Sequence, residues 1–135
     1  MNRHRDWTIY SINVVSCLIC IGSNYNRKEN LLLARRRLTA LFPSIRFTGE
    51  QETRPLFFRN PALFSNQVAR FYTDADAERV VKELKTIEKE AGREKEDKKR
   101  EKVCLDIDLL VFDNRVLKPE DLKRDYILKG LEELK

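Results

Sequence analysis

The alternation of hydrophobic and polar positions predicts four β-strands along the chain. Residues 12–21 and 103–112 are long apolar runs, which are typical of strands buried on both faces. Residues 45–53 and 64–72 show weaker patterns and are predicted to be two further strands. The two long runs therefore indicate the interior of a sheet.

Two segments between these strands have the periodicity of amphipathic helices. The first follows Gly22-Ser-Asn, begins at the predicted capping pair Asn26 and Glu29, and ends at Pro43. The second lies before Gly92, which is expected to end it as a C-cap. Apolar positions at helical spacing are Leu31, Ala34, Leu38, Leu41 and Phe42 in the first segment, and Ala77, Val80, Val81, Leu84, Ile87 and Ala91 in the second.

The order of the predicted elements is strand, helix, strand, strand, helix, strand, which is a split βαβ pattern. We expect an α+β, ferredoxin-like sandwich: a four-stranded antiparallel sheet with two helices on one face. The other face is left free for a ligand. Residues 1–11 are expected to be a loose tail, and residues 12–135 a single domain.

Two segments flank the last predicted strand. Residues 93–102 hold six basic and four acidic side chains and no apolar one, so a flexible loop is expected there. Beyond the strand, Asp113 and Asn114 predict a turn. A short amphipathic segment then follows Pro119 and runs to Lys135.

The net charge of +5 favours a polyanionic partner such as a nucleotide, but a soluble basic protein without such a partner fits equally well. The apolar run at residues 12–21 is too short to span a bilayer. Cys17 and Cys20 form a CxxC, yet residues three apart on a strand face opposite sides. His4 is the only histidine, so no zinc site can be completed, and we expect reduced core cysteines.

The strongest chemical signal is the pair Asp106 and Asp108 within an apolar strand. Residues two apart on a strand point to the same face, about 7 Å apart. Two such carboxylates repel each other, so they need Lys or Arg partners or bound cations. Mg²⁺ sites often use one or two carboxylates together with substrate phosphates. The alternative is a pair of surface aspartates on an edge strand, without a role in binding a metal.

Two weaker signals stand beside the aspartates. Gly22-Ser-Asn at the end of the first strand allows close backbone approach and anion contact, but an ordinary strand-to-helix turn is equally consistent. The basic residues Lys98, Lys99, Arg100 and Lys102 could fold over phosphates, or they could form a solvated connector.

These blocks occur together at characteristic spacings. Ile-Gly-Ser-Asn at 21–24 and Leu-Asp-Ile-Asp-Leu-Leu at 105–110 accompany Thr53, Asn66 and the stretch that joins Ile87-Glu88 to Gly92-Arg93. In this combination the chain resembles the 6-hydroxymethyl-7,8-dihydropterin pyrophosphokinases, from about Val14 onward. The Leu-Asp-x-Asp block is fairly specific for this family, whereas Gly-Ser-Asn is specific only when it occurs together with the other blocks.

The resemblance implies a role for individual side chains. Asp106 and Asp108 would hold two Mg²⁺ ions, with ATP as the co-substrate. The pterin would be contacted by Thr53, Leu56, Phe64, Asn66 and Tyr126. ATP would be surrounded by Glu88, Arg93 and Arg115, with the backbone of Leu109 to Phe112 near the adenine.

The chain departs from the family pattern just before the aspartate strand. The family usually has Trp-Gly-Pro-Arg-Thr there, whereas residues 100–104 read Arg-Glu-Lys-Val-Cys. The missing arginine's charge is expected to come from Lys99, Arg100 or Lys102, which would then lie at ATP. Glu120 also follows a proline where the family usually has histidine.

The resemblance implies transfer of pyrophosphate from ATP to the hydroxymethyl group of the pterin, giving AMP, in folate biosynthesis. A monomeric, cytoplasmic enzyme without nucleic-acid or membrane partners is expected. One alternative is a degenerate relative that binds pterin or nucleotide without efficient catalysis. Another is a single-stranded RNA-binding module, although the first strand lacks the exposed aromatics such modules use and two aspartates would repel phosphate.

Overall fold

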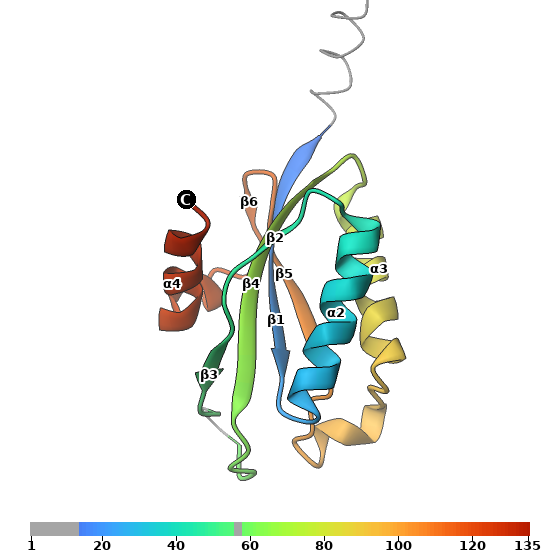
Figure 1. Cartoon of the computed structure of the whole chain (residues 1–135), viewed down its shortest axis with the longest axis vertical. Coiled ribbons are helices and arrows are strands. Elements are labelled where there is room, and N and C mark those ends of the chain that lie inside the picture. Colours follow the sequence, from blue (N-terminus) through green and yellow to red (C-terminus); the bar gives the residue numbers. More distant parts are fainter. Residues whose placement is uncertain (1–13, 56–57) are drawn as a thin grey trace, which may run out of the picture.

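A six-stranded antiparallel sheet crosses the molecule (Figure 1). The computed structural model describes residues 14–55 and 58–135, so the tail predicted at residues 1–11 lies outside the described residues. The sheet order is β2, β4, β1, β5, β6, and β3 also pairs with β4. No helix among the described residues is long and apolar enough to span a membrane. The strands are β1 (Val15–Ser23), β2 (Arg46–Phe47), β3 (Gln51–Thr53), β4 (Phe64–Thr73), β5 (Asp106–Phe112) and β6 (Arg115–Val116), and the helices are α2 (Arg27–Leu41), α3 (Ala77–Glu90) and α4 (Asp125–Glu133).

The prediction of four strands was wrong, for two local reasons. The hydroxyl of Thr48 accepts the backbone amide of Val68 at 3.0 Å, which replaces a backbone acceptor in the ladder. The strand predicted at residues 45–53 is thereby divided into β2 and β3. At the opposite edge, the predicted turn at residues 113–114 is confirmed, and it returns the chain to pair as β6 with β5. The predicted α+β class and the alternation of long elements are confirmed.

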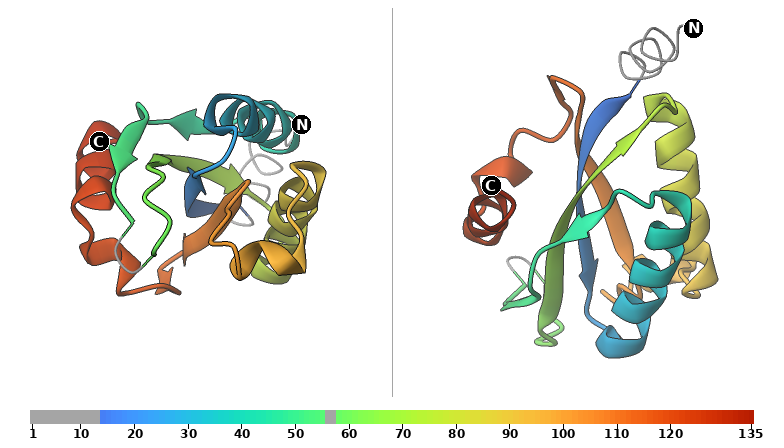
Figure 2. Two further views of the ribbon diagram at one scale, coloured as in Figure 1. Left: turned by 90° about the horizontal axis from the view of Figure 1, so that it is seen from below. Right: turned by 45° about the horizontal axis from the view of Figure 1, so that its top comes forward.

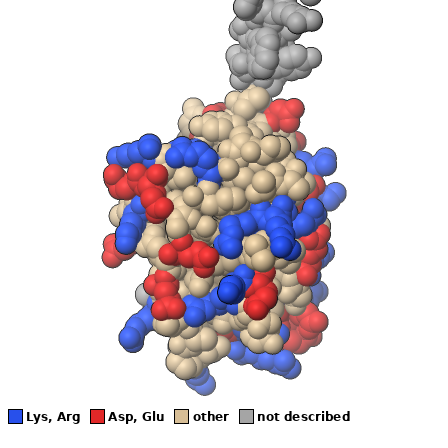
Figure 3. Space-filling view, viewed as in Figure 1, with Lys and Arg blue, Asp and Glu red and all other residues tan. Residues whose placement is uncertain are grey.

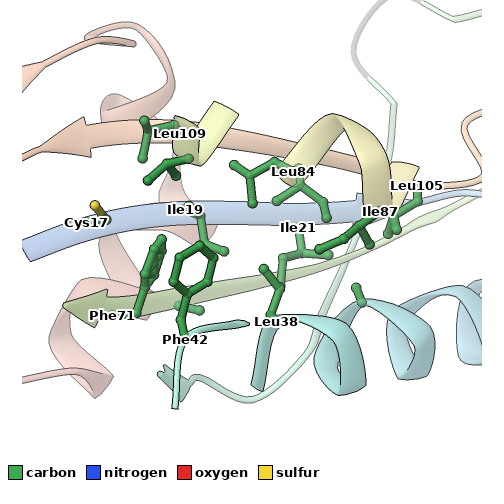
Figure 4. Packing of buried hydrophobic residues seen from close by; sticks show 14 of the residues in the cluster. Cys17, Ile19, Ile21, Leu38, Phe42, Phe71, Leu84, Ile87, Leu105 and Leu109 are labelled. Atoms are coloured by element: carbon green, nitrogen blue, oxygen red, sulfur yellow. The ribbon is translucent and has the colours of Figure 1, made fainter. Parts of the chain in front are cut away.

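Helices α2 and α3 cover one face of the sheet, as predicted, and enclose the main hydrophobic core (Figure 4). Phe42, which follows α2, stacks on Phe71 of β4 with ring centroids 3.9 Å apart. Cys17 is fully buried in this core, because alternate residues of β1 face the two helices. Further members are Ile19, Ile21, Leu31, Ala34, Leu38, Ala69, Val80, Leu84, Ile87, Leu105, Ile107, Leu109 and Phe112.

The opposite face is not left free as predicted, because α4 packs against part of it (Figure 2). Ile127 and Leu134 of the C-terminal segment join a second apolar cluster with Leu18, Val68 and Leu110 of the sheet. The helix approaches closely at Gly130, where a Cβ would lie 2.7 Å from a methyl carbon of Val68. The prediction of two helices on one face is therefore correct for α2 and α3, but it missed α4 on the other face.

The ends of the helices only partly follow the predicted signals. Asn26 stands at the predicted N-cap position of α2, but it has a left-handed φ of 43° and makes no side-chain cap, so the predicted side-chain capping was wrong. Asp76 caps α3 by accepting the backbone amide of Arg79 at 2.8 Å. Gly92 has a φ of 92°, which confirms its predicted place after α3.

The loop predicted at residues 93–102 contains regular structure. Residues Lys95–Lys98 form a 3₁₀ helix (η1), preceded by a reciprocal capping box between Glu94 and Asp97. The side chain of Asp97 accepts the Glu94 amide at 2.9 Å and is buried despite its charge. Hydrogen bonds that acidic side chains accept thus help to order a segment that has no apolar residue to bury.

Basic and acidic side chains lie intermixed on the face viewed in Figure 3. Arg27 of α2 is 3.0 Å from Glu52, and Arg35 is 3.2 Å from Glu50. These pairs join α2 to the edge of the sheet at β3. Part of the positive charge of α2 is therefore neutralised by the protein itself.

Candidate active site

A cavity of about 620 Å³ opens on the α4 side of the sheet. Its floor is formed by β1 and β5, and its walls by β3, β4 and the start of α4. Seven of the residues predicted for the site border it: Thr53, Phe64, Asn66, Arg93, Asp106, Asp108 and Tyr126. Leu56, also predicted to contact the pterin, lies outside the described residues.

Asp106 and Asp108 project together into this cavity from β5, while Ile107 between them points into the core under α3. Asp106 lies 2.9 Å from the guanidinium of Arg93, and Asp108 lies 3.8 Å from the ammonium group of Lys118. The two carboxylates are 40% and 35% exposed. Both negative charges are therefore only partly compensated by basic partners.

Burial and the negative charge of Asp106 raise the pKa of Asp108 to about 6. This excess negative charge fits a divalent cation, which would favour the ionised form of both groups. Among the described residues, no three His, Cys, Asp or Glu side chains are grouped so as to enclose a metal. A pair of carboxylates that leaves further positions to water and substrate phosphates matches the usual preference of Mg²⁺.

Glu88 of α3 contacts the strand that carries the two aspartates from its core-facing side. Its carboxylate accepts the backbone amide of Ile107 at 2.7 Å and lies 3.0 Å from the guanidinium of Arg93. Burial raises the pKa of Glu88 to about 7 in spite of these two contacts. Burial would lower the pKa of Arg93, but its hydrogen bond to Asp106 and the charge of Glu88 raise it above the ordinary value. Glu88 thus helps fix the positions of Ile107 and Arg93.

The opposite wall of the cavity carries hydrogen-bonding and aromatic groups. The amide of Asn66 donates to the hydroxyl of Thr53 at 2.6 Å, which leaves the amide oxygen and the remaining N–H open to the cavity. Phe64 lies on the same face of β4, two residues before Asn66, and tilts against Phe58 with centroids 5.7 Å apart. Tyr126 enters from α4. This wall suits a flat ring with polar edges.

Gly22 lies in the floor of the cavity, between the aspartates of β5 and the hydrogen-bonding wall. It lies opposite Asn66 in the β1–β4 pairing and opposite Asp106 in the β1–β5 pairing. A Cβ at this position would be 3.2 Å from the amide oxygen of Asn66. Glycine therefore keeps the floor open and leaves room for the orientation of Asn66.

The rest of the Gly-Ser-Asn block holds loops together. Asn24 accepts the Val103 amide at 2.6 Å through its side chain and donates to the carbonyl of Glu101 at 2.8 Å. The hydroxyl of Ser23 donates to the carbonyl of Tyr25 at 2.9 Å. The block therefore forms a turn and attaches the segment before β5, and phosphate contact is not needed to explain it.

A second cavity, also of about 620 Å³, adjoins the first along η1. Phe58, Arg93 and Val103 border both cavities. Six basic side chains border the second one, which gives it a surplus over the four acidic groups there. These basic residues are Lys85, Lys89, Arg93, Lys95, Lys98 and Lys102, and the acidic ones are Glu88, Glu94, Asp97 and Glu101.

A comparison with protein families matches residues 18–135 to 7,8-dihydro-6-hydroxymethylpterin-pyrophosphokinase. The chain belongs to this family. It is also 29% identical over 131 residues to the folic acid synthesis protein fol1 of Pneumocystis carinii. That match covers 90% of this chain but only 18% of the relative, so the chain spans a small part of the relative's length.

Several residues that the family resemblance assigned to ATP lie away from both cavities of this pyrophosphokinase family member. The side chains of Leu109 and Phe112 are buried in the core beneath the helices, and contact of the adenine with the backbone of this strand stays a prediction. Arg115 stands over the ring of Phe112 at 5.4 Å, on the β5–β6 hairpin. Arg100 is exposed and borders neither cavity, whereas Lys102 borders the second and lies over the ring of Tyr25.

Other residues of the site were missed by sequence reasoning. Cys20, Arg54, Lys123 and Arg124 all border the first cavity. The basic pair Lys123-Arg124 directly precedes α4 within the predicted amphipathic C-terminal segment, which was the signal available in the sequence. Cys20 and Arg54 gave no such signal, because the sheet register brings Cys20 to the cavity and Arg54 follows the end of β3 there.

Proposed function

We propose that this chain transfers pyrophosphate from ATP to the hydroxymethyl group of 6-hydroxymethyl-7,8-dihydropterin, giving AMP, as a step of folate biosynthesis. The observation that carries the proposal is the placement of Asp106 and Asp108. They project from β5 beside a cavity with a hydrogen-bonding, aromatic wall, and a basic cavity adjoins it. Membership of the pyrophosphokinase family supports the same reaction.

The first cavity is the proposed pterin site. A pterin is flat and carries amide-like donors and acceptors along one edge, which Asn66 and Thr53 can match. Phe64 and Tyr126 supply aromatic surface at the faces of the ring. The hydroxymethyl group would then point toward the carboxylates of β5.

The second cavity is the proposed site of the nucleotide's phosphates. Lys95, Lys98 and Lys102 supply positive charge there, and Arg93 stands where the two cavities meet. Asp106 and Asp108 would hold two Mg²⁺ ions against these phosphates, and bound Mg²⁺ supplies charge neutralisation of the phosphate oxygens. Arg93 then acts as a fixed positive group beside Asp106.

The proposed reaction depends mainly on position and charge. The hydroxymethyl oxygen forms a bond to the β-phosphorus of ATP as the bond to the oxygen bridging the α- and β-phosphorus atoms breaks. AMP leaves, and the hydroxyl proton is released to solvent. The protein residues hold the two substrates in line and exclude water from the floor beside Gly22.

A monomeric enzyme is also part of the proposal, and it is supported by the fact that described residues of a single copy border both cavities. A cytoplasmic location is part of the proposal, and it is supported by the free thiols of Cys17, Cys20 and Cys104. Pterin and ATP are the proposed partners.

The test is turnover of the pterin alcohol with ATP and Mg²⁺, read as AMP release. We expect release that requires both substrates and the metal. AMP release that is independent of the pterin would contradict the proposal. Binding of both substrates without turnover would instead identify a degenerate relative, in line with the altered block at residues 100–104.

A further inference from the structure

Glu101 has a backbone conformation that its residue type rarely adopts. Its φ of 55° lies in the left-handed region, where a Cβ crowds the backbone. The family block described above has glycine at this position, which would carry no such strain. An unfavourable conformation persists only where surrounding contacts hold it.

Those contacts come from two other segments of the chain. One carboxylate oxygen of Glu101 accepts the backbone amides of Arg59 at 2.7 Å and Asn60 at 2.8 Å. Its backbone carbonyl accepts the side-chain amides of Asn24 at 2.8 Å and Asn60 at 3.4 Å. Glu101 therefore joins the end of β1 and the segment at residues 59–60 to the loop before β5.

The joined segments border the proposed substrate sites. Phe58 directly precedes Arg59, borders both cavities and lies against Phe64. Val103 also borders both cavities, and Asn24 fixes it through hydrogen bonds of 2.6 and 2.9 Å. Val103 in turn lies three residues before Asp106. A displacement of Glu101 would thus reach the pterin wall and the metal-binding strand together.

We propose that Glu101 is a positioning residue that couples the two cavities, so that a ligand in one strengthens binding in the other. This inference rests on the proposed function. A ligand in either cavity fixes Phe58 and Val103, and the second ligand then meets walls that are already ordered. The carboxylate of Glu101 links this ordering of the two walls, because it joins the segment at residues 59–60 to the loop before β5.

Two substitutions at Glu101 distinguish the effect of its carboxylate contacts from the effect of its strained backbone. Glu101→Gly removes both amide contacts while relieving the positive φ, so the loop loses its connection without added strain. Glu101→Gln keeps an acceptor oxygen at the same reach and serves as the conservative rescue. Glu96→Ala, at an exposed position of η1, is the matched control for losing one negative charge from this segment.

The measurement is calorimetric titration of the pterin alcohol with and without a non-hydrolysable ATP analogue and Mg²⁺. In the parent protein we expect the analogue to tighten pterin binding by about tenfold or more. Glu101→Gly should lower that factor to about one while each ligand alone binds within about threefold of the parent. Glu101→Gln and Glu96→Ala should keep the parent's factor. An undiminished factor in Glu101→Gly would overturn the inference.

Amide hydrogen exchange of the unliganded protein tests the contact independently of any activity. Exchange at Arg59 and Asn60 should be faster in Glu101→Gly than in the parent, and unchanged in Glu96→Ala. Equal exchange in the parent and Glu101→Gly would show that the carboxylate does not hold this segment. If the parent binds neither ligand, the proposed function fails and the coupling with it, whereas binding without coupling overturns only the role of Glu101.

Discussion

Gly22 of β1 lies directly opposite Asp106 of β5, so the carboxylate stands beside a position that has no side chain. On the other side of Gly22 stands Asn66, whose amide oxygen would be 3.2 Å from an added Cβ. One glycine therefore separates the proposed metal ligands from the proposed pterin contacts. The effect of this glycine on pterin binding can be measured without substituting a residue of either set.

Gly22→Ala should weaken pterin binding by about tenfold, because the new methyl group turns the Asn66 amide away from Thr53 and fills the floor. Nucleotide affinity should stay unchanged. Calorimetric titration of each ligand checks this. Gly49→Ala is the matched control, since a Cβ there would meet Glu133 at an ordinary 3.6 Å. Normal pterin affinity in Gly22→Ala would place the pterin elsewhere.

Asp106→Asn and Asp108→Asn should each lower Mg²⁺-dependent AMP release by roughly a thousandfold, because one of the two proposed metal-binding charges is lost. The circular dichroism spectrum should match that of the parent, since an amide keeps the shape of the carboxyl group. Asp113→Asn, on the exposed β5–β6 turn, should retain parental activity. Near-parental activity in either of the first two variants at saturating Mg²⁺ would show that the metal is bound by other groups.

Stability without divalent cations should fall as the pH rises from about 5 to 7.5. The folded-state pKa of Glu88, about 7, lies above its ordinary 4.5, so the folded protein binds the proton more tightly than the unfolded chain. Ionisation then favours unfolding, and Asp108 adds to the same trend. In Glu88→Gln the fall in the free energy of unfolding over this pH range should be smaller by about 2 kcal/mol. Urea unfolding in EDTA at three pH values checks this, and an equal slope in parent and variant would contradict it.

Gly130→Ala should destabilise the protein by about 1–3 kcal/mol, because the Cβ would lie 2.7 and 2.9 Å from two carbons of Val68. The helix α4 must then shift outward and carry Tyr126 with it, so pterin affinity should fall as well. Thermal unfolding and pterin titration test the two effects. Leu128→Ala, at a half-exposed position of α4, is the control and should change neither by much.

Replacement of Lys98, Lys99, Arg100 and Lys102 by Ser should weaken ATP binding far more than pterin binding. Flexible lysine contacts in solvent are screened by salt, so parental ATP affinity should also fall steeply between low and high ionic strength. Calorimetry at two salt concentrations measures both effects. The exposed pair Lys28 and Arg36, changed to Ser, removes two positive charges elsewhere on the surface and shows how much a distant loss of charge weakens ATP binding. Equal ATP affinity at low salt in the fourfold variant and the parent would show that the loop is only a solvated connector and does not bind the phosphates.

Strong periodicity made the long elements predictable from the sequence. The apolar runs of β1 and β5 and the stripes of α2 and α3 require burial, and burial fixed their place in the sheet. The alternation of side chains along β5 likewise predicted that Asp106 and Asp108 share a face. Such local rules depend only on spacing along one element.

What escaped prediction depends on contacts between distant segments. Thr48 divides an edge strand through a hydrogen bond to Val68, a partner 20 residues away. The close approach of Gly130 to the sheet is equally invisible in a helical pattern. Asp97 orders a charged loop by accepting a single backbone amide. None of these contacts leaves a periodic trace in the sequence.

Cys17 and Cys20 place one thiol on each side of the same strand. Burial raises the pKa of Cys17 to about 11, and burial with the charges of Asp108 and Asp106 raises that of Cys20 to about 12. Both therefore react slowly with alkylating reagents at neutral pH. Modification of Cys20 requires an empty cavity, whereas modification of Cys17 requires the helices to leave the sheet. Peptide-level labelling rates at these two positions would thus report ligand occupancy and global opening as separate signals from the native chain.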